Sequence, residues 1–140
     1  MDVWVHWTEL DSDDDPLWDV QYCLYAYLQQ QQDRLLYIGK ADYSTLRSRW
    51  HGEHKDQLFE DIWREYDIGE DEVRVLQGEL ELEEGYRRSS ELLADVESLL
   101  IKRLQPFGNI STTKTRIARP GLRVHCEGDW PFKRRRFYDE

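Results

Sequence analysis

Five polar side chains are of types that could act on a charged substrate: Tyr25, Tyr37, Arg49, Glu97 and Asn109. A phenol can transfer a proton when a nearby cation lowers its pKa from about 10, a guanidinium binds anionic oxygens, and a carboxylate binds divalent metals. Each residue alone also has an ordinary structural explanation. The tyrosines lie in segments rich in β-forming residues, the arginine precedes a tryptophan, and the asparagine follows a Pro-Phe-Gly turn.

Glu97 is the residue whose position is hardest to explain by structure alone. It falls between Leu93 and Leu100, one step around the expected helix from Val96, at the edge of an apolar stripe. A carboxylate in such a place either extends to solvent or has a partner inside the protein. The residue alone leaves both explanations open.

The order of these residues along the chain adds information that no single residue carries. Tyr25 follows Cys23-Leu24, Tyr37 begins the run Tyr37-Ile38-Gly39-Lys40, and Arg49, Glu97 and Asn109 come later in that order. This series resembles the GIY-YIG nuclease superfamily over about residues 21–110. The second half of the family's name is present literally as Tyr-Ile-Gly, whereas a cysteine stands where the first half has glycine.

The resemblance implies a role for each residue that matches. Tyr25 and Tyr37 would lie side by side on neighbouring strands, and Tyr37 is the better candidate to help deprotonate an attacking water. Arg49 would hold the scissile phosphate and offset the charge of the transition state. Glu97 would be the single protein ligand of one Mg²⁺ or Mn²⁺ ion, with waters and phosphate oxygens completing the coordination.

Five further positions would support the site or contact nucleic acid. Gly39 would permit close approach of the backbone, Lys40 would contact a neighbouring phosphate, and Asn109 would brace the site through hydrogen bonds. Family members often carry a histidine four residues after the arginine, but this chain has a glutamate there. His51 and His54 are therefore both candidates for the histidine's role.

Three segments have the pattern of strands. Residues 22–28 and 34–39 are rich in β-forming residues and read as a hairpin, and residues 72–82 alternate as a third strand with a possible bulge at Gly78. Residues 3–10 alternate loosely, as an added strand would.

Two segments are expected to be helical. Residues 46–66 carry a partial apolar stripe and a break near Gly52. A longer helix is expected from about Ser89 or Ser90 to Leu104, with Ser90 as its N-cap. Strands followed by a buried helix favour an α+β fold with a small central antiparallel three-stranded sheet flanked by helices.

The length of 140 residues suits one domain, residues 1–140. We divide it into an acidic N-terminal extension, a GIY-YIG-like core and a basic, irregular C-terminal extension. These three parts cover residues 1–20, 21–110 and 111–140.

The charge of the chain is polarised. The net charge is −10, which is unfavourable for binding phosphate. Residues 1–20 carry −7 and residues 56–86 carry −10, whereas residues 34–55 carry +3 and residues 111–136 carry +6. Such runs are commonly solvated faces, but the two basic blocks could also form one face for phosphate.

Composition indicates a folded protein. Hydrophobic residues make up 39% of the chain and aromatic residues 13%, which is enough for a core. Cys23 and Cys126 lack metal-ligand spacing and are interpreted as thiols of a reducing compartment. No signal peptide or membrane span is recognisable, so we expect a cytoplasmic protein without membrane contact.

We therefore expect a metal-dependent endonuclease that hydrolyses phosphodiester bonds of nucleic acid, with DNA as the favoured substrate. The alternative is a catalytically silent GIY-YIG-fold module that binds nucleic acid or a protein partner. A third possibility is a structural or protein-interaction domain with acidic docking surfaces. Either extension could serve a homodimer or a protein partner.

Overall fold

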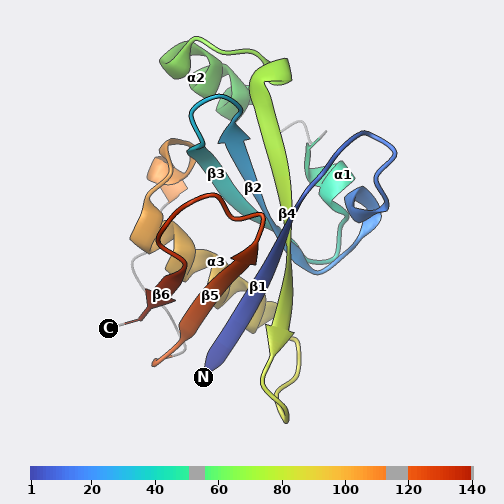
Figure 1. Cartoon of the computed structure of the whole chain (residues 1–140), viewed down its shortest axis with the longest axis vertical. Coiled ribbons are helices and arrows are strands. Elements are labelled where there is room, and N and C mark those ends of the chain that lie inside the picture. The colour runs from blue at the N-terminus through green and yellow to red at the C-terminus, as the bar shows by residue number, and fades with distance from the viewer. Residues whose placement is uncertain (51–55, 113–119, 140) are drawn as a thin grey trace.

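The structure, a computed structural model, describes residues 1–50, 56–112 and 120–139, with the backbone alone at positions 110–112. Within these residues the chain forms three helices and a mixed six-stranded sheet (Figure 1). The helices are α1 (Leu46–Trp50), α2 (Asp56–Tyr66) and α3 (Ser90–Leu104). The strands are β1 (Asp2–Glu9), β2 (Cys23–Gln29), β3 (Arg34–Ala41), β4 (Val73–Leu82), β5 (Arg123–Gly128) and β6 (Arg136–Tyr138). The α+β class is as expected.

The prediction of a three-stranded sheet was wrong. The strand order is β3-β2-β4-β1-β5-β6, so both predicted extensions add strands to the sheet. The tail from position 111 was predicted to be irregular, yet it supplies β5 and β6. Strand β1 pairs antiparallel with β4 on one side and parallel with β5 on the other. The acidic N-terminal segment therefore begins with an interior strand of the sheet.

Alternation along β1 explains why this strand lies inside the sheet. Val3, Val5 and Trp7 point to the same face and are at most 1% exposed. If β4 were an edge strand, the apolar residues of its second half, such as Leu80, would lack these neighbours. Pairing with β1 covers that half of β4 and buries both sets of side chains together.

The predicted bulge at Gly78 was also wrong. Gly78 pairs in regular register with Trp7 of β1 and with Leu24 of β2. A Cβ atom at this position would lie 2.8 Å from Val5 Cγ1 and 3.0 Å from Trp7, so the glycine makes room for the packed side chains of β1. The irregularity lies between β2 and β3 instead, where the register shifts between Tyr27 and Leu28.

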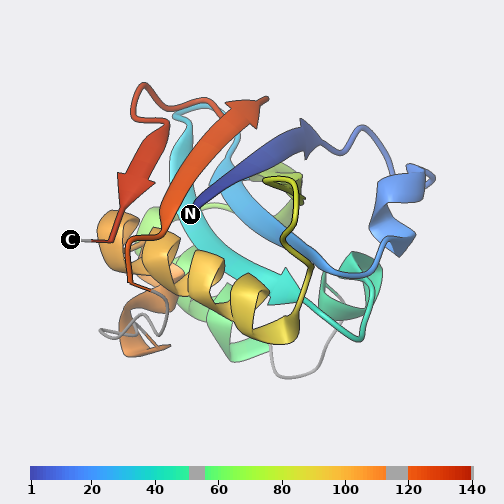
Figure 2. The same cartoon turned by 90° about the horizontal axis from the view of Figure 1, so that it is seen from below.

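Helix α3 packs on one face of the sheet. Its apolar residues join a cluster to which all six strands contribute, and Figure 2 shows the sheet curling around the helix. The helix has the predicted end at Leu104, but its N-cap is Ser89 and not Ser90. The Ser89 hydroxyl accepts a hydrogen bond from Leu92 N at 3.1 Å. Gln105, with φ 46°, ends the helix in the left-handed conformation before Pro106.

The other face of the β2–β3–β4 part carries a second apolar cluster with α1 and α2. Strand β2 is buried along its whole length, so its alternate residues face different clusters. Leu24, Ala26 and Leu28 face α3, whereas Tyr25 and Tyr27 face the second cluster. The predicted helical segment over 46–66 is helical at both ends, and the expected break at Gly52 lies outside the described residues. None of the described helices has the length and apolarity needed to cross a membrane.

Candidate active site

Three tyrosines from β2 and β3 form a contiguous cluster. The ring centroids are 5.3 Å apart for Tyr25 and Tyr27, 6.0 Å for Tyr25 and Tyr37, and 5.6 Å for Tyr27 and Tyr37. Tyr27 is paired with Tyr37 in the antiparallel register, which places both rings on the same face. The predicted neighbours Tyr25 and Tyr37 are thus together, and a third tyrosine joins them.

Gly39 makes this arrangement possible. It is paired with Tyr25 across the strands, and a Cβ atom at position 39 would overlap with the Tyr25 ring. The absence of a side chain therefore lets the tyrosine ring lie directly against the β3 backbone. This close approach is a physical reason for glycine in the Tyr37-Ile38-Gly39 run.

Arg49 and Glu97 bring opposite charges to the tyrosine cluster from two helices. Arg49 of α1 is partly buried and interacts electrostatically with Tyr25, Tyr37 and Glu97. Its Nε atom is buried and has no hydrogen-bond partner within the described residues. Glu97 of α3 is 9% exposed and its charge acts on Tyr37. The carboxylate at the edge of the apolar stripe thus lies inside the protein, near these two groups.

Burial keeps the three phenols neutral. Desolvation raises the pKa of Tyr25 and of Tyr27 far above 10, and the positive charge of Arg49 only partly opposes this effect. The pKa of Tyr37 is raised by desolvation and then by the negative charge of Glu97. At neutral pH these three hydroxyls are therefore protonated, and none of them is a phenolate.

Asn109 fastens β3 at its outer edge. The Asn109 Oδ1 accepts a hydrogen bond from Ile38 N at 2.9 Å, and its Nδ2 donates to Ile38 O at 2.8 Å. The side chain is 1% exposed, and it mimics a strand partner for the residue between Tyr37 and Gly39. The preceding Gly108 allows this approach, because a Cβ atom there would lie 2.7 Å from Leu36 O. Asn109 thus supports the strand that carries Tyr37.

An open hollow of about 260 Å³ is connected to the cluster through Arg49, which contributes to its lining. It lies where β3 ends and α1 begins, and two cationic side chains, Lys40 and Arg49, contribute to its lining. The remaining lining residues are Asp42, Tyr43 and Ser44. This is the place beside the tyrosines where a phosphate group could meet two positive charges.

The described part of the basic block over 34–55, residues 34–50, does not act as one patch. The Arg34 guanidinium lies over the ring of Tyr66, 4.3 Å from its centroid, and Arg47 forms an ion pair with Asp19 at 3.0 Å. The expected basic face at this block is therefore reduced, within the described residues, to the two cations of the hollow, Lys40 and Arg49.

The second basic block is partly used in packing. Arg123 forms an ion pair with Asp2 at 2.7 Å, and Arg135 donates to Cys126 O and to Trp130 O. In the strand order, β5 and β6 lie at the opposite end of the sheet from β3. The described part of this block is thus not adjacent to the tyrosine cluster through the sheet.

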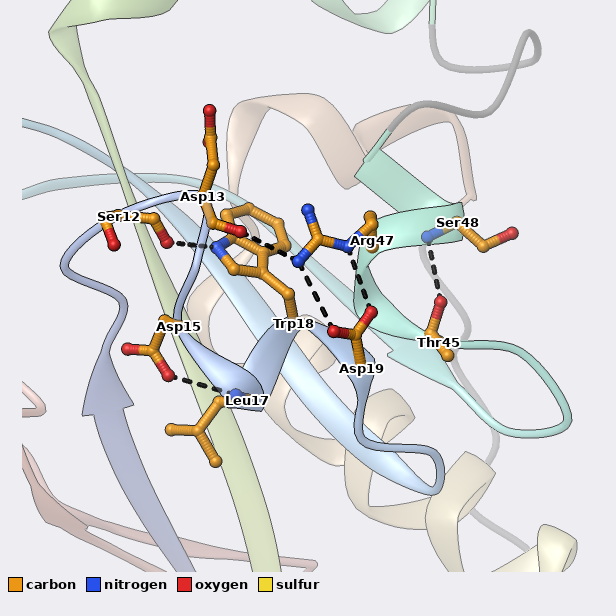
Figure 3. A network of polar contacts seen from close by, with 9 residues as sticks. All are labelled: Ser12, Asp13, Asp15, Leu17, Trp18, Asp19, Thr45, Arg47 and Ser48. Atoms are coloured by element: carbon orange, nitrogen blue, oxygen red, sulfur yellow. Dashed lines mark hydrogen bonds and ion pairs between the residues drawn. The ribbon is translucent and has the colours of Figure 1, made fainter.

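The acidic N-terminal loop is fastened beside the site. Arg47 donates to Asp19 and to the backbone oxygen of Asp13, while Trp18 donates from Nε1 to Ser12 O (Figure 3). The Trp18 ring is 7% exposed and lies 6.1 Å from the ring of Trp50. This loop is therefore packed against α1, the helix that carries Arg49.

A divalent metal fits the described donors only in one way. Within the described residues no group of three histidine, cysteine or carboxylate side chains could hold an ion. Glu97 is the buried carboxylate beside Arg49 and Tyr37, so an ion here would be held by Glu97 and by water and phosphate oxygens, a donor set that suits Mg²⁺. The candidate histidines His51 and His54 lie outside the described residues.

Tyr27 was missed as a site residue. Its spacing of two from Tyr25 in a strand was a sufficient signal, because such residues share a face. Its hydroxyl is buried and has no hydrogen-bond partner within the described residues. Trp50 and Phe59 pack on its ring at 5.0 and 5.7 Å, so Tyr27 connects the site to the second apolar cluster.

The cysteines are not part of this site. Both are buried free thiols, and burial raises the pKa of Cys23 to about 11 and that of Cys126 to about 12. Both side chains are therefore protonated at neutral pH and poor nucleophiles.

Comparisons of the chain with protein-family models, with curated proteins and with solved structures find no match.

Proposed function

We propose that this chain is a metal-dependent endonuclease of the GIY-YIG type, which hydrolyses phosphodiester bonds of nucleic acid, with DNA as the favoured substrate. The observation that carries the proposal is the convergence of four side chains from four elements. Tyr25, Tyr37, Arg49 and Glu97 come from β2, β3, α1 and α3 and interact electrostatically at one place. The hollow lined by Lys40 and Arg49 supports the proposal, because it offers a phosphate group two positive charges.

Each side chain has a definite task in this proposal. Arg49, whose buried Nε has no hydrogen-bond partner within the described residues, binds a phosphate oxygen and stabilises the negative charge that grows on the phosphoryl group. Glu97 holds the metal, which when bound polarises the phosphate and lowers the pKa of a water. Tyr37 orients the attacking water through a hydrogen bond.

The raised pKa of Tyr37 limits that last role. As a neutral phenol, Tyr37 positions the water but does not remove its proton at neutral pH. The sequence-based expectation that this tyrosine helps to deprotonate water therefore requires an additional positive charge beside it. Arg49 supplies part of that charge.

The test is cleavage by the purified chain. Supercoiled plasmid and branched DNA are incubated with Mg²⁺ or Mn²⁺, and nicking is expected to disappear with EDTA and with Glu97→Gln. Asp95→Asn is the matched control, because Asp95 lies on the same helix and has the same 9% exposure. Circular dichroism must show that both variants are folded. Absence of cleavage of DNA and RNA substrates with either metal would refute the proposal.

Binding without cleavage is the second candidate function. Cys23 stands where the family has glycine, and few cations surround the site because Arg34 and Arg47 have partners inside the protein. If wild-type protein binds labelled DNA without cutting it, and the affinity falls with added salt, this second function holds.

A further inference from the structure

An aromatic ring stands almost fully exposed beside the candidate active site. Tyr43 lies in the loop between β3 and α1, and 88% of its surface is exposed, more than for any other large hydrophobic residue described. Because the Tyr43 ring is not buried in the core, both faces of the ring can contact a ligand. Single exposed aromatic residues also occur without a function, so a binding role for Tyr43 depends on the groups around it.

The loop that carries this ring is fastened at both ends. Tyr22 N donates to Asp42 O at 3.3 Å on one side. On the other side, Thr45 Oγ1 accepts from Ser48 N at 3.1 Å and so caps the first turn of α1. The Tyr43 hydroxyl itself accepts a hydrogen bond from Ser90 Oγ at 3.4 Å. A ring held in this way loses little conformational entropy when a flat ligand stacks on it.

The hollow next to Tyr43 combines charges of both signs. Lys40 and Arg49 favour one phosphate group, whereas Asp42 disfavours a second phosphate and accepts hydrogen bonds. A single nucleotide matches both features of the hollow. Its phosphate suits the two cations, and its base offers hydrogen-bond donors to Asp42 and a flat π-face to the Tyr43 ring. A base within a duplex is stacked on both sides and cannot offer its face to a side chain.

We propose that Tyr43 stacks on an unpaired nucleobase whose neighbouring phosphate is held by Lys40 and Arg49. This inference rests on the proposed nuclease function and specifies its substrate. The preferred DNA carries a single-stranded nucleotide at the bond that is cut, as in a gap, a flap or a bulge.

Binding and cleavage are measured separately to test this proposal. Fluorescein-labelled single-stranded DNA and blunt duplex DNA of the same sequence are titrated with the full chain in EDTA, and fluorescence anisotropy gives each Kd. A 2-aminopurine in the single strand reports stacking through quenching of its fluorescence. The variants are Tyr43→Ala, Tyr43→Trp and, as a control, Tyr86→Ala. Tyr86 is also an exposed tyrosine, with 49% of its surface accessible, but it lies in the segment between β4 and α3.

We expect Tyr43→Ala to weaken binding of the single strand about tenfold, within the roughly 5- to 150-fold range of base stacking on an aromatic side chain. It should also abolish the quenching and leave duplex binding unchanged, whereas Tyr43→Trp should retain both signals. An unchanged Kd, an equal loss for duplex and single strand, or the same loss in Tyr86→Ala would overturn the proposal. So would a wild-type chain that binds no DNA.

The two proposals fail in different ways. If the wild-type chain cuts gapped and intact duplexes, and Tyr43→Ala leaves the ratio of the two rates unchanged, the nuclease function stands and stacking is refuted. If the wild-type chain cuts nothing, but Tyr43→Ala weakens single-strand binding selectively, the stacking site stands and the nuclease function is lost.

Discussion

Replacing Asn109 with alanine should destabilise the fold by an amount that can be worked out from two hydrogen bonds. The side chain donates to Ile38 O and accepts from Ile38 N, at 2.8 and 2.9 Å, in a buried place. Leaving one buried backbone group without a partner costs about 1–3 kcal/mol. We expect Asn109→Ala to lower the free energy of unfolding by about 2–4 kcal/mol, because the vacated space admits some water.

Urea denaturation followed by circular dichroism measures this change. With an m-value of about 2 kcal/mol/M, in the middle of the usual range, the midpoint should fall by roughly 1–2 M. Hydrogen exchange localises the effect: the Ile38 amide should exchange much faster in the variant, whereas the Ala26 amide on the neighbouring strand should change only with global stability.

Asn109→Asp is the matched variant, since it keeps the size of the side chain and the acceptor. At pH 7 its carboxylate faces Ile38 O and cannot donate, so its destabilisation should be similar to that of the alanine variant. Burial raises the pKa of such a carboxyl, so the protonated form is favoured in the folded state and the loss should shrink as the pH falls towards 5. A destabilisation below about 0.5 kcal/mol by alanine, with unchanged exchange at Ile38, would refute the bracing role of Asn109.

Three further predictions concern the tyrosine cluster and the loop beside it. Gly39→Ala should cost about 1–3 kcal/mol of stability, because the new methyl group displaces the Tyr25 ring, and a urea midpoint equal to that of wild type would contradict this packing. The three clustered tyrosines have raised pKa values, so in the unfolded chain they ionise near pH 10 while in the folded protein they do not. Their contribution to stability should be constant below about pH 9 and should be lost as the pH rises above about 10. Tyr27→Phe should make that loss smaller, and urea midpoints between pH 8 and 11.5 that decline equally in both proteins would argue against a neutral buried phenol. Arg47→Ala should change global stability by less than about 1 kcal/mol but speed protease cleavage within residues 11–19, whereas Arg64→Ala, on the exposed part of α2, should not. Equal cleavage rates in the two arginine variants would show that Arg47 does not hold the loop.

Local patterns predicted the elements of the fold better than their assembly. The hairpin of β2 and β3 and the end of α3 at Leu104 follow from propensity and periodicity over neighbouring residues. The alternation over 3–10 indicated a strand, but its position beside β4 and β5 depends on pairing with distant residues. For the same reason the strands hidden in the basic tail were not predicted, since β5 is short and its partner lies at the other end of the chain.

For the site, too, the candidate residues were predicted better than their surroundings. The resemblance to a known family, and not the spacing alone, led to the expectation that Tyr25, Tyr37 and Glu97 lie near one another, because a period fixes only the face that a residue takes within its own element. The charge count over 34–55 was misleading, because partners such as Asp19 for Arg47 and Tyr66 for Arg34 come from remote segments. Net charge of a segment therefore says little about which cations remain available to a ligand.

The parallel pairing of β1 with β5 also bears on how the chain folds. Val3 lies opposite Val124, so a strand from the start of the chain meets its second neighbour about 120 residues later. Closing so long a loop lowers the entropy of the chain before stabilising contacts between the two strands have formed. Non-local strand pairing of this kind therefore slows folding. During synthesis, β1 can pair with β4 while its other edge stays open, and an open edge invites pairing with other molecules. The interval before β5 has docked is therefore the stage at which we expect aggregation to compete with folding.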